Sequence, residues 1–386
     1  MNRILVLDTT LRDGEQAPGN FLGIDEKVTI AIALENAGID IIDVGFPASN
    51  LRDFQAVNKI SISVKRPIIC VLARAIEKDI DIAVQSLANA KFKRIQTGIS
   101  TSEIHLKSKL KLSKEEAIDC AVRAVRYAKK SIEDVQFYAE DAGRTDNEYL
   151  AKVIEKVIKA GATVVNIPDT TGFCLPAEYA QKINFLLDNV KGIHNVTIST
   201  HCHNDLGLAT ANTLYGVLNG ARQIELSING VGERAGNAAL EEVLTILNYK
   251  LKDKFTTNFK LTEAYGLSLL VAKLMNHPIP RNKPVVGSNC FSHTSGIHQD
   301  GILKNPLNYE ILSPKDVGQG ASKIILSDKS GRAALYYSFK KLGYNIQSDK
   351  LNELYKEFIS LSAIKYPITD KDLKSLITKN DLLNDI

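Results

Sequence analysis

Short runs of apolar, mostly β-branched residues recur along this chain and alternate with segments whose apolar residues follow a helical spacing. Runs of this kind, bounded by glycine, proline and small polar residues, are typical of strands. Most of them are almost continuously apolar, as are parallel strands buried on both faces. The pattern predicts eight strands, over Ile4–Asp8, Ile39–Phe46, Pro67–Ala73, Arg94–Ser100, Val135–Glu140, Thr163–Asp169, Val196–His203 and Gln223–Gly230.

The segments between these runs are predicted as amphipathic helices. Ile118, Val122 and Val125 stand at positions i, i+4 and i+7, which places them on one face of a helix. The segments 25–38 and 147–161 each end in a glycine, a residue that commonly ends helices. Eight strands that alternate with helices over roughly 250 residues predict a (β/α)8 TIM barrel, an α/β fold.

An open, doubly wound α/β sheet is the structural alternative. Such a sheet usually has a glycine-rich turn after its first strand, and the stretch TTLRDGEQ at 9–16 is not one. The stretch NGVGERAGN at 229–237 contains glycines, but their spacing differs from that of the dinucleotide-binding fingerprint. The barrel is therefore the favoured prediction.

The alternation ends near Met275, where the proline-rich stretch NHPIPRNKPVVG follows. Clustered prolines mark a boundary or a linker. Beyond this stretch the periodicity is weak at first and then becomes helical toward the C-terminus. We therefore predict two regions, a barrel over 1–275 and a linker with small, mainly helical subdomains over 276–386.

Composition narrows the class of protein. Of the 386 residues, 44% are apolar and 24% are charged, which is ordinary for a globular protein with a sizeable core. The net charge of +4 is too weak to argue for a nucleic-acid partner, and no apolar run is long enough to span a membrane. The five cysteines are scattered, and the chain begins directly with a predicted strand. We therefore expect a reducing, cytoplasmic location and no signal peptide.

Polar residues follow the predicted strands at their carboxyl ends. In a (β/α)8 barrel these ends and the loops after them form one face, and that face carries the active site. Independent solvated turns would not be expected to gather carboxylates, imidazoles and amides at the same end of each repeating unit. The residues concerned are Asp8, Arg12, Asp13, Glu140, Asp169, Thr170, His201, His203, Asn229, Glu233 and Asn237.

The sharpest chemical signal is His201-x-His203 at the end of the seventh predicted strand. Side chains two residues apart on a strand point to the same face, so both imidazoles aim into the barrel mouth and Cys202 faces the core. With Asp13 they form a two-histidine, one-carboxylate metal site, to which Asn237 adds an amide oxygen. This mixed set suits Mn²⁺, Zn²⁺ or Mg²⁺. The competing interpretation is a group of ordinary polar residues.

Several long motifs occur in order along the chain: DTTLRDGEQAPG, GFPAS, AEDAGRTDNEYLA, NIPDTTG, HCHNDLGLATAN, NGVGERAGNAALEEV and TSGIHQDGILKNPLNYEILSPKDVG. They resemble the α-isopropylmalate synthase/homocitrate synthase family of metal-dependent acyltransferases, and its 2-isopropylmalate synthase branch most of all. The resemblance implies a barrel followed by a linker region that reaches across a homodimer. It also implies condensation of acetyl-CoA with the 2-oxo acid 3-methyl-2-oxobutanoate, the first committed step of leucine biosynthesis.

The resemblance also assigns roles to individual residues. Arg12 matches the catalytic arginine of the family, and Glu140 and Thr170 match positions that hold the 2-oxo acid. His298 and Tyr309 match residues that the linker region contributes to catalysis, in some members across the dimer. The metal site of the family is matched by Asp13, His201, His203 and Asn237.

These residue types suit the chemistry independently of the resemblance. A metal ion that chelates a 2-oxo acid polarises its ketone, and Arg12 would stabilise the alkoxide charge that develops. A base must take a proton from the acetyl methyl group, and the candidates are His298 with Tyr309, or the carboxylate of Glu140. Gln16 is expected to touch the substrate.

Three other segments receive structural interpretations. Asp8 is expected to support the first loop from behind, and Glu233 with Arg234 to form a local ion pair that supports Asn237. The lysine-rich stretch 105–114 is predicted as a solvated loop and helix start, with CoA phosphates as an alternative partner.

Two features depart from the family pattern. Most 2-isopropylmalate synthases have a histidine where this chain has Gln96, at a position facing the substrate, so Gln96 bears on the choice of 2-oxo acid. The chain also ends soon after the linker helices. We therefore expect that the C-terminal leucine-binding regulatory domain of longer members is absent, along with leucine inhibition by that route.

Other functions compete with this prediction. Homocitrate and citramalate synthases share the fold and the metal but accept 2-oxoglutarate or pyruvate, and the longer dicarboxylate needs an extra cation in the pocket. A lyase of the hydroxymethylglutaryl-CoA type would cleave a carbon–carbon bond on the same barrel, although the motif around His298 fits it poorly. A non-enzymatic scaffold would be expected to have lost some of Arg12, Asp13, His201 and His203, which are all present.

Overall fold

The computed structural model describes residues 1–379 and divides into two compact units, Met1–Ile279 and the chain from Pro280 onward. The sequence places the boundary slightly earlier, after Met275. The chain just beyond that point still bonds to the last barrel helix, because the backbone N–H of His277 donates to the carbonyl of Ala272. The second predicted region runs to 386, and its residues 380–386 lie outside the described part.

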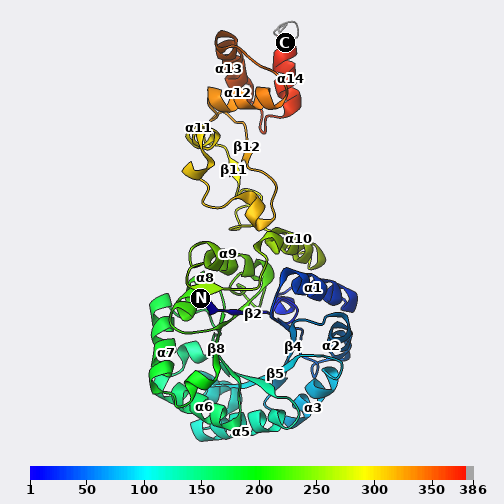
Figure 1. The fold of residues 1–386 in the computed structure, drawn as a ribbon, viewed down its shortest axis with the longest axis vertical. Helices are drawn as coiled ribbons and strands as arrows, with labels where there is room; N and C mark the ends of the chain where they lie inside the picture. The colour runs from blue at the N-terminus through cyan, green and yellow to red at the C-terminus, as the bar shows by residue number, and fades with distance from the viewer. Residues whose placement is uncertain (380–386) are drawn as a thin grey trace. The chain divides into compact units, whose positions relative to one another are not determined.

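Eight parallel strands close into a barrel in the first unit, and helices surround it (Figure 1). Each strand pairs with the next along the chain and the last pairs with the first, so this sheet has no edge. The predicted (β/α)8 fold is confirmed and the open sheet is excluded. The strands are β2 (Leu5–Asp8), β3 (Ile41–Asp43), β4 (Ile68–Arg74), β5 (Lys93–Ser100), β6 (Asp134–Glu140), β7 (Val164–Asp169), β8 (Thr197–Cys202) and β9 (Gln223–Leu226).

Two of these strands end three or four residues before the position that the sequence predicts. The pattern extends β3 to position 46 and β9 to position 230, but β3 ends at Asp43 and β9 at Leu226. Soon after β3, Gly45 takes φ 140°. After β9 the chain makes a 3-10 turn, η5 (Ile228–Gly230), in which Asn229 has φ 61°. Since strands need a negative φ, these positions stop the pairing.

The helices between the strands pack their apolar residues against the outside of the barrel. Two glycines end helices as predicted, since Gly38 follows α1 and Gly161 follows α6, both with positive φ. Space also requires Gly38, because a Cβ there would lie 2.3 Å from the carbonyl oxygen of Asn258. The helices are α1 (Ile24–Ala37), α2 (Leu51–Ser63), α3 (Glu77–Ser86), α4 (Glu103–His105), α5 (Lys114–Lys129), α6 (Asn147–Ala160), α7 (Pro176–Asn189), α8 (Ala209–Leu218), α9 (Leu240–Tyr249) and α10 (Ala264–Leu274).

The inside of the barrel contains both apolar and polar side chains. Leu7, Ile41 and Cys70, from three adjacent strands, form a small buried apolar cluster. Further inward-facing positions carry buried polar side chains instead, which must pair with one another because no water surrounds them. These polar residues are Asp43, Arg94, Gln96, Gln136, Ser199, Gln223 and Glu225.

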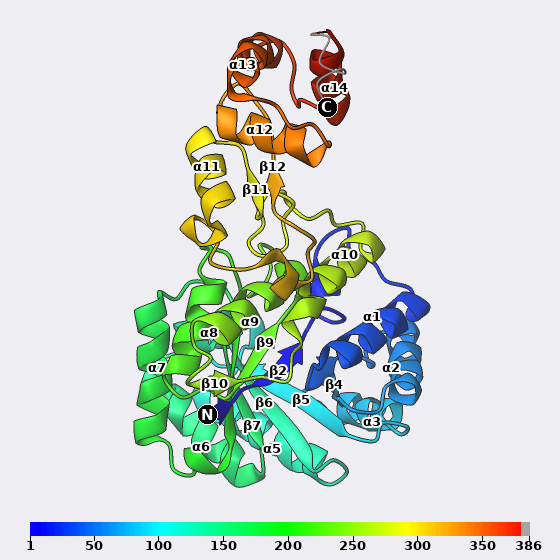
Figure 2. The same ribbon diagram turned by 45° about the horizontal axis from the view of Figure 1, so that its top comes forward.

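The second unit is mainly helical, as predicted (Figure 2). It has an apolar core of its own. Two short parallel strands, β11 (Ser292–His293) and β12 (Lys323–Ile324), pair near its start, and α11 (Gly296–Lys304) lies between them in sequence. The core is formed by residues of α12 (Arg332–Lys341), α13 (Ser348–Ser362) and α14 (Asp370–Lys379), together with Leu326 and Ile368. Among the described residues, no helix of either unit is long and apolar enough to cross a membrane.

Candidate active site

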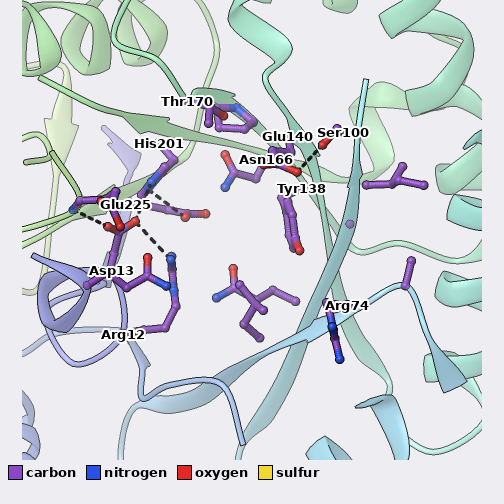
Figure 3. A pocket seen from close by; sticks show the side chains of 18 of the residues that line it. Arg12, Asp13, Arg74, Ser100, Tyr138, Glu140, Asn166, Thr170, His201 and Glu225 are labelled. Atoms are coloured by element: carbon purple, nitrogen blue, oxygen red, sulfur yellow. Dashed lines mark hydrogen bonds and ion pairs between the residues drawn. The ribbon is translucent and has the colours of Figure 1, made fainter. Parts of the chain in front are cut away.

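A cavity of about 550 Å³ opens at the carboxyl ends of the barrel strands. Its walls come from these strand ends and the loops that follow them, which is where a (β/α)8 barrel carries its site. Figure 3 shows the charged cluster around Asp13 on one side and Tyr138 with Glu140 on the other. The cavity brings together the predicted residues Arg12, Asp13, Gln16, Gln96, Glu140, Thr170, His201 and His203.

The two histidines and the carboxylate converge on one point. His201 Nε2 lies 3.3 Å from Asp13 Oδ2 and 3.2 Å from His203 Nε2, and His203 Nε2 lies 3.8 Å from Asp13 Oδ2. All three side chains are buried. Both imidazoles point inward as strand alternation predicts, and Cys202 between them lies in the apolar core as expected.

The spacing of these atoms fits a divalent cation. Metal–ligand distances near 2.1 Å place neighbouring ligand atoms about 3.0 to 3.4 Å apart in octahedral or tetrahedral geometry. Two of the three separations fall within this range, and the third, at 3.8 Å, is only slightly longer. The residues present therefore fit a metal ion.

Asn237 lies next to this cluster, because its backbone forms an isolated bridge with His203. Its Oδ1 is buried and has no hydrogen-bond partner. Its Nδ2 makes only long contacts, at 3.5 Å to Thr9 Oγ1 and 3.4 Å to the Val231 carbonyl. A buried amide oxygen without a partner is costly unless another group binds it, so Asn237 suits the ligand role.

The protonation states of these groups also suit a metal. Burial, together with the neighbouring His201, lowers the pKa of His203 to about 4, so its imidazole is neutral at neutral pH. Burial by itself would raise the pKa of Asp13, but Arg12 and the two imidazoles hold it well below its usual range. A neutral imidazole beside a carboxylate anion is the state in which both groups ligate metals.

Arg12 stands beside the cluster on the loop after β2. Its Nη1 donates to Asp13 Oδ2 at 3.2 Å, and its Nε donates to Asp43 Oδ2 at 2.6 Å. Asp43 is fully buried, and burial raises its pKa although the Arg12 guanidinium opposes the shift. Gln96 lines the cavity, but its Nε2 donates to the same oxygen of Asp43 at 2.5 Å. The guanidinium is therefore anchored on both sides.

Glu140 ends β6 and lines the cavity across from Asp13 and Arg12 (Figure 3). Ser100 donates to its Oε2, and Lys109 Nζ lies 2.6 Å from its Oε1. Lys109 belongs to the lysine-rich stretch that the sequence predicts as a solvated loop. Its side chain instead lines the cavity, because the loop after β5 returns to the carboxyl end of β6.

The loop that carries Arg12 and Asp13 is held from behind. Asp8 accepts hydrogen bonds from the backbone N–H and the hydroxyl of Thr10, at 3.0 and 2.9 Å, which confirms its expected supporting role. Glu15 pairs with the fully buried Lys27 at 2.6 Å and so ties the loop to α1.

The loop after β9 differs from the expected local ion pair between Glu233 and Arg234. Arg234 pairs with Asp205 at 2.8 Å and donates to the carbonyl of Thr170 at 2.6 Å. The backbone N–H of Glu233 donates to Asp13 Oδ1 at 3.1 Å. This loop therefore supports the Asp13 carboxylate and Thr170, and it does so through contacts far apart in sequence.

His298 and Tyr309 belong to the second unit, whereas the cavity is lined by residues of the first. Their rings stack with centroids 4.1 Å apart and planes at 25°. Tyr309 follows the turn η7 (Pro306–Asn308), and its ring lies over Gly301, where a Cβ would come within 2.5 Å of it. The structure thus brings this predicted pair together.

Sequence reasoning missed other residues that line the cavity. Tyr138 had a signal, because it stands two positions before Glu140 on the same strand and therefore shares its inward face. On β7, Asn166 and Pro168 stand two positions apart and therefore also share one face, which lines the cavity. For Lys109 the sequence offered only the alternative of CoA phosphates for its whole stretch, and its pairing with Glu140 had no signal, since only the tertiary path of its loop brings it to the site. The missed residues include Arg74, Lys109, Tyr138, Asn166 and Glu225.

Two family models match the chain. The HMGL-like model matches residues 3–271, and the homocitrate synthase post-HMGL domain-like model matches residues 285–366. The first match falls in the barrel unit and the second in the unit that begins at Pro280.

Solved structures share the barrel at low sequence identity. An HMG-CoA lyase from Brucella melitensis has a TM-score of 0.61 and 20% identity, over 72% of this chain and 100% of that chain. An HMG-CoA lyase from Acinetobacter baumannii, in complex with coenzyme A and 3-methylmalate, has a TM-score of 0.60 and 19% identity, over 72% and 93%. At this identity they show the fold alone.

Curated relatives match at higher identity. The 2-isopropylmalate synthase of Parabacteroides distasonis is 54% identical over 379 residues, which cover 98% of this chain and 76% of that protein. The enzyme of the same name from Dictyoglomus turgidum is 46% identical over 378 residues, which cover 98% and 75%. These relatives match nearly the whole chain, and the HMGL-like model matches its barrel. This chain therefore belongs to the 2-isopropylmalate synthase family.

Proposed function

We propose that this chain condenses acetyl-CoA with 3-methyl-2-oxobutanoate, which gives 2-isopropylmalate and CoA in leucine biosynthesis. Relatives named 2-isopropylmalate synthase match nearly the whole chain. The observation that carries the proposal is the convergence of Asp13, His201 and His203 beside Arg12 in one cavity. This arrangement suits carbon–carbon bond formation at the ketone of a 2-oxo acid.

The proposed metal ligands are Asp13, His201, His203 and the orphaned amide oxygen of Asn237. When bound, a divalent cation supplies Lewis-acid chemistry at a carbonyl oxygen. We propose Mn²⁺, with Zn²⁺ and Mg²⁺ as alternatives, because the set mixes imidazole nitrogens with carboxylate and amide oxygens.

Arg12 is proposed to stabilise the negative charge that develops on the ketone oxygen as the new bond forms. Its Nε and Nη1 are held by Asp43 and Asp13, so its orientation is fixed before substrate arrives. A preorganised positive charge in a site shielded from water stabilises an alkoxide without further rearrangement.

The charges of the cavity favour an acceptor with a single carboxylate. The other arginines and lysines in its wall each have a carboxylate partner, and a second carboxylate on the acceptor would have to displace one of them. The pairs are Lys109–Glu140 at 2.6 Å, Arg74–Asp79 at 2.6 Å and Arg234–Asp205 at 2.8 Å. An apolar wall suited to an isopropyl group comes from Leu72, Ile76, Ile99 and Leu110.

A proton leaves the acetyl methyl group before the carbon–carbon bond forms, and water then cleaves the thioester. We propose His298 as the base, with Tyr309 stacked on its ring. Glu140 is the alternative, but Ser100 and Lys109 already engage both of its carboxylate oxygens. Glu140 is therefore better suited to orienting the 2-oxo acid, together with Thr170 and Gln16, which also line the cavity.

We further propose a homodimer in which the linker region of one subunit serves the site of the other. Three large apolar side chains close in sequence to His298 and Tyr309 support this. Ile297, Leu307 and Ile311 are 76%, 80% and 89% exposed. These three side chains lie within 15 positions of one another in the sequence, and a second copy of this chain would cover them.

A thiol-release assay tests the proposed reaction. The purified protein is incubated with acetyl-CoA and one acceptor from the series 3-methyl-2-oxobutanoate, pyruvate and 2-oxoglutarate. We expect the fastest release of CoA with 3-methyl-2-oxobutanoate, loss of activity with a chelator, and recovery when Mn²⁺ is added back.

Faster turnover of pyruvate or of 2-oxoglutarate would replace this function by that of a citramalate or homocitrate synthase. Cleavage of hydroxymethylglutaryl-CoA without any condensation would indicate a lyase. A protein that releases no thiol with any acceptor and any of the three metals would contradict the proposed enzyme altogether.

A further inference from the structure

Gln96 is a buried amide whose two ends are both engaged. Its side chain is inside the barrel on β5, with 2% of the residue exposed. Its Nε2 donates to Asp43 Oδ2 at 2.5 Å, and its Oε1 lies 3.4 Å from Gln136 Nε2. One of its two N–H donors and one acceptor site of its oxygen are thus taken by buried neighbours, which fixes the direction of the amide.

Arg94 and Gln136, which also lie inside the barrel, determine which way this amide is turned. Arg94 can only donate, and its Nη1 donates to Gln136 Oε1 at 3.2 Å. Gln136 must therefore turn its Nε2 the other way, toward Gln96 and toward Glu225 Oε1 at 2.7 Å. Gln96 then presents its oxygen to Gln136 and its Nε2 to Asp43.

Asp43 depends on this donor. Its Oδ1 is buried without a hydrogen-bond partner, so Oδ2 receives both the Gln96 amide and the Nε–H of Arg12. A buried carboxylate holds its place only through such bonds, because no water replaces a lost donor. The chain of contacts thus runs from Arg94 through two glutamines and Asp43 to Arg12.

We propose that Gln96 is a positioning residue: it fixes Arg12 through Asp43 and does not select the acceptor. The inference rests on the proposed function, because Arg12 is the group that stabilises the developing alkoxide. It gives Gln96 a role different from the substrate contact that its place in the pocket alone would suggest.

The kinetic test uses Gln96→Met, which keeps the length of the side chain and removes the amide. We expect kcat to fall about tenfold or more, the effect typical of losing a partner that orients an active group. The fall should be equal for every acceptor that the wild type turns over, with KM and the ranking of acceptors unchanged. A raised KM or a new ranking with kcat intact would overturn the proposal.

Thr97→Val is the matched control. Thr97 is the next residue on β5, is fully buried, and makes no side-chain hydrogen bond. It points away from the barrel interior, so its isosteric replacement should leave kcat and KM as in the wild type. An equal loss in both variants would mean that any change in this strand disturbs the site, which would contradict a specific role for Gln96.

Asp43→Asn provides a second variant if Gln96→Met folds poorly. It should show the same uniform loss of kcat, since Arg12 loses the charge of one of its two carboxylate partners, the one at its Nε. If Gln96 acts through Asp43, the double variant Gln96→Met/Asp43→Asn should have the same kcat as Asp43→Asn alone. Fully multiplicative losses would show that the two residues act independently and would refute the relay.

A measurement on the protein alone separates failure of this inference from failure of the proposed function. In ¹⁵N-arginine-labelled protein, the Nε–H signal of Arg12, assigned by its loss in Arg12→Lys, should be protected from exchange by its 2.6 Å bond to Asp43. Gln96→Met should shift this signal and speed its exchange, whereas Thr97→Val should not. An unchanged signal in Gln96→Met would refute the relay even if the wild type condenses every acceptor, and a changed signal would support it even if the wild type condenses none.

Discussion

Asp13 is the residue at which the separate parts of the site meet. Its Oδ2 faces both imidazoles and the Arg12 guanidinium, and its Oδ1 accepts the backbone N–H of Glu233. One carboxylate therefore joins the loop after β2, the end of β8 and the loop after β9. Because the group is buried, each of these contacts restricts the others, and the ligand geometry is coupled to the position of the arginine.

Removing one imidazole should weaken metal binding directly. For His203→Ala we expect Mn²⁺ affinity, measured by titration calorimetry, to fall by more than about 100-fold, since even the loss of outer partners of a ligand costs 10- to 100-fold. His194→Ala is the control, because His194 is exposed on the turn η4 (Ile193–Asn195). Equal affinities in the wild type and His203→Ala would remove His203 from the ligand set.

Arg12→Lys should lower kcat while leaving metal binding nearly intact. A lysine keeps the charge but cannot reproduce the two bonds that the guanidinium makes to Asp43 and Asp13. Loss of one group that stabilises a developing oxyanion typically costs about 100- to 1,000-fold in kcat. Steady-state kinetics beside Mn²⁺ titration would separate the two effects, and a wild-type kcat would exclude Arg12 from catalysis.

At the scale of elements, the strands direct side chains into the cavity and must also pack closely against one another. β5 and β6 pair closely, with Gly98 opposite Tyr138. A Cβ at position 98 would lie 2.1 Å from the Tyr138 carbonyl oxygen and 2.6 Å from its ring. The glycine therefore lets a large ring stand in the wall of the cavity, where Figure 3 shows Tyr138.

Gly98→Ala should therefore destabilise the barrel and disturb the acceptor side of the cavity. Overpacking of a close contact of this kind costs about 1 to 3 kcal/mol of unfolding free energy, measured by denaturant titration. Gly266→Ala in α10 is the control, because a Cβ there meets nothing within 4 Å. Alanine is the better helix former, so we expect the control to be neutral or slightly stabilising. Unchanged stability and acceptor KM in Gly98→Ala would show that the strands move apart easily.

At the scale of the whole molecule, the two units carry different parts of the proposed chemistry. The barrel unit holds the metal cluster and Arg12, and the second unit holds the stacked pair His298 and Tyr309. The two family matches divide the chain in the same way. If the second unit of one subunit serves the barrel of another, activity becomes a property of the dimer.

Co-expression of two differently tagged, inactive variants tests this. His298→Ala and Asp13→Asn should each be almost inactive alone. Their purified heterodimer should recover about half of the wild-type activity, because one of its two sites then combines an intact barrel with an intact second unit. A heterodimer as inactive as its parents would place His298 at the site of its own chain, and full activity of His298→Ala would exclude it as the base.

The barrel and part of its site could be predicted because both follow from local spacing. Parallel strands buried on two faces produce apolar runs, and a period of two sets His201 and His203 on one face. The lengths of β3 and β9 could not be predicted from the runs. They end at backbone conformations, at Gly45 and Asn229, that hydrophobicity does not reveal.

The sequence by itself determined the fold class and the strand ends at which the polar side chains gather, and it singled out Asp13, His201 and His203 as a candidate metal cluster, because each depends on short-range periodicity and on residue type. Only the tertiary structure decided which partner each buried polar group takes. Lys109 meets Glu140, and Gln96 turns to Asp43, across separations of 31 and 53 positions. Hydrogen bonds between strands form only when the barrel closes, and the need to satisfy every buried donor then fixes their direction.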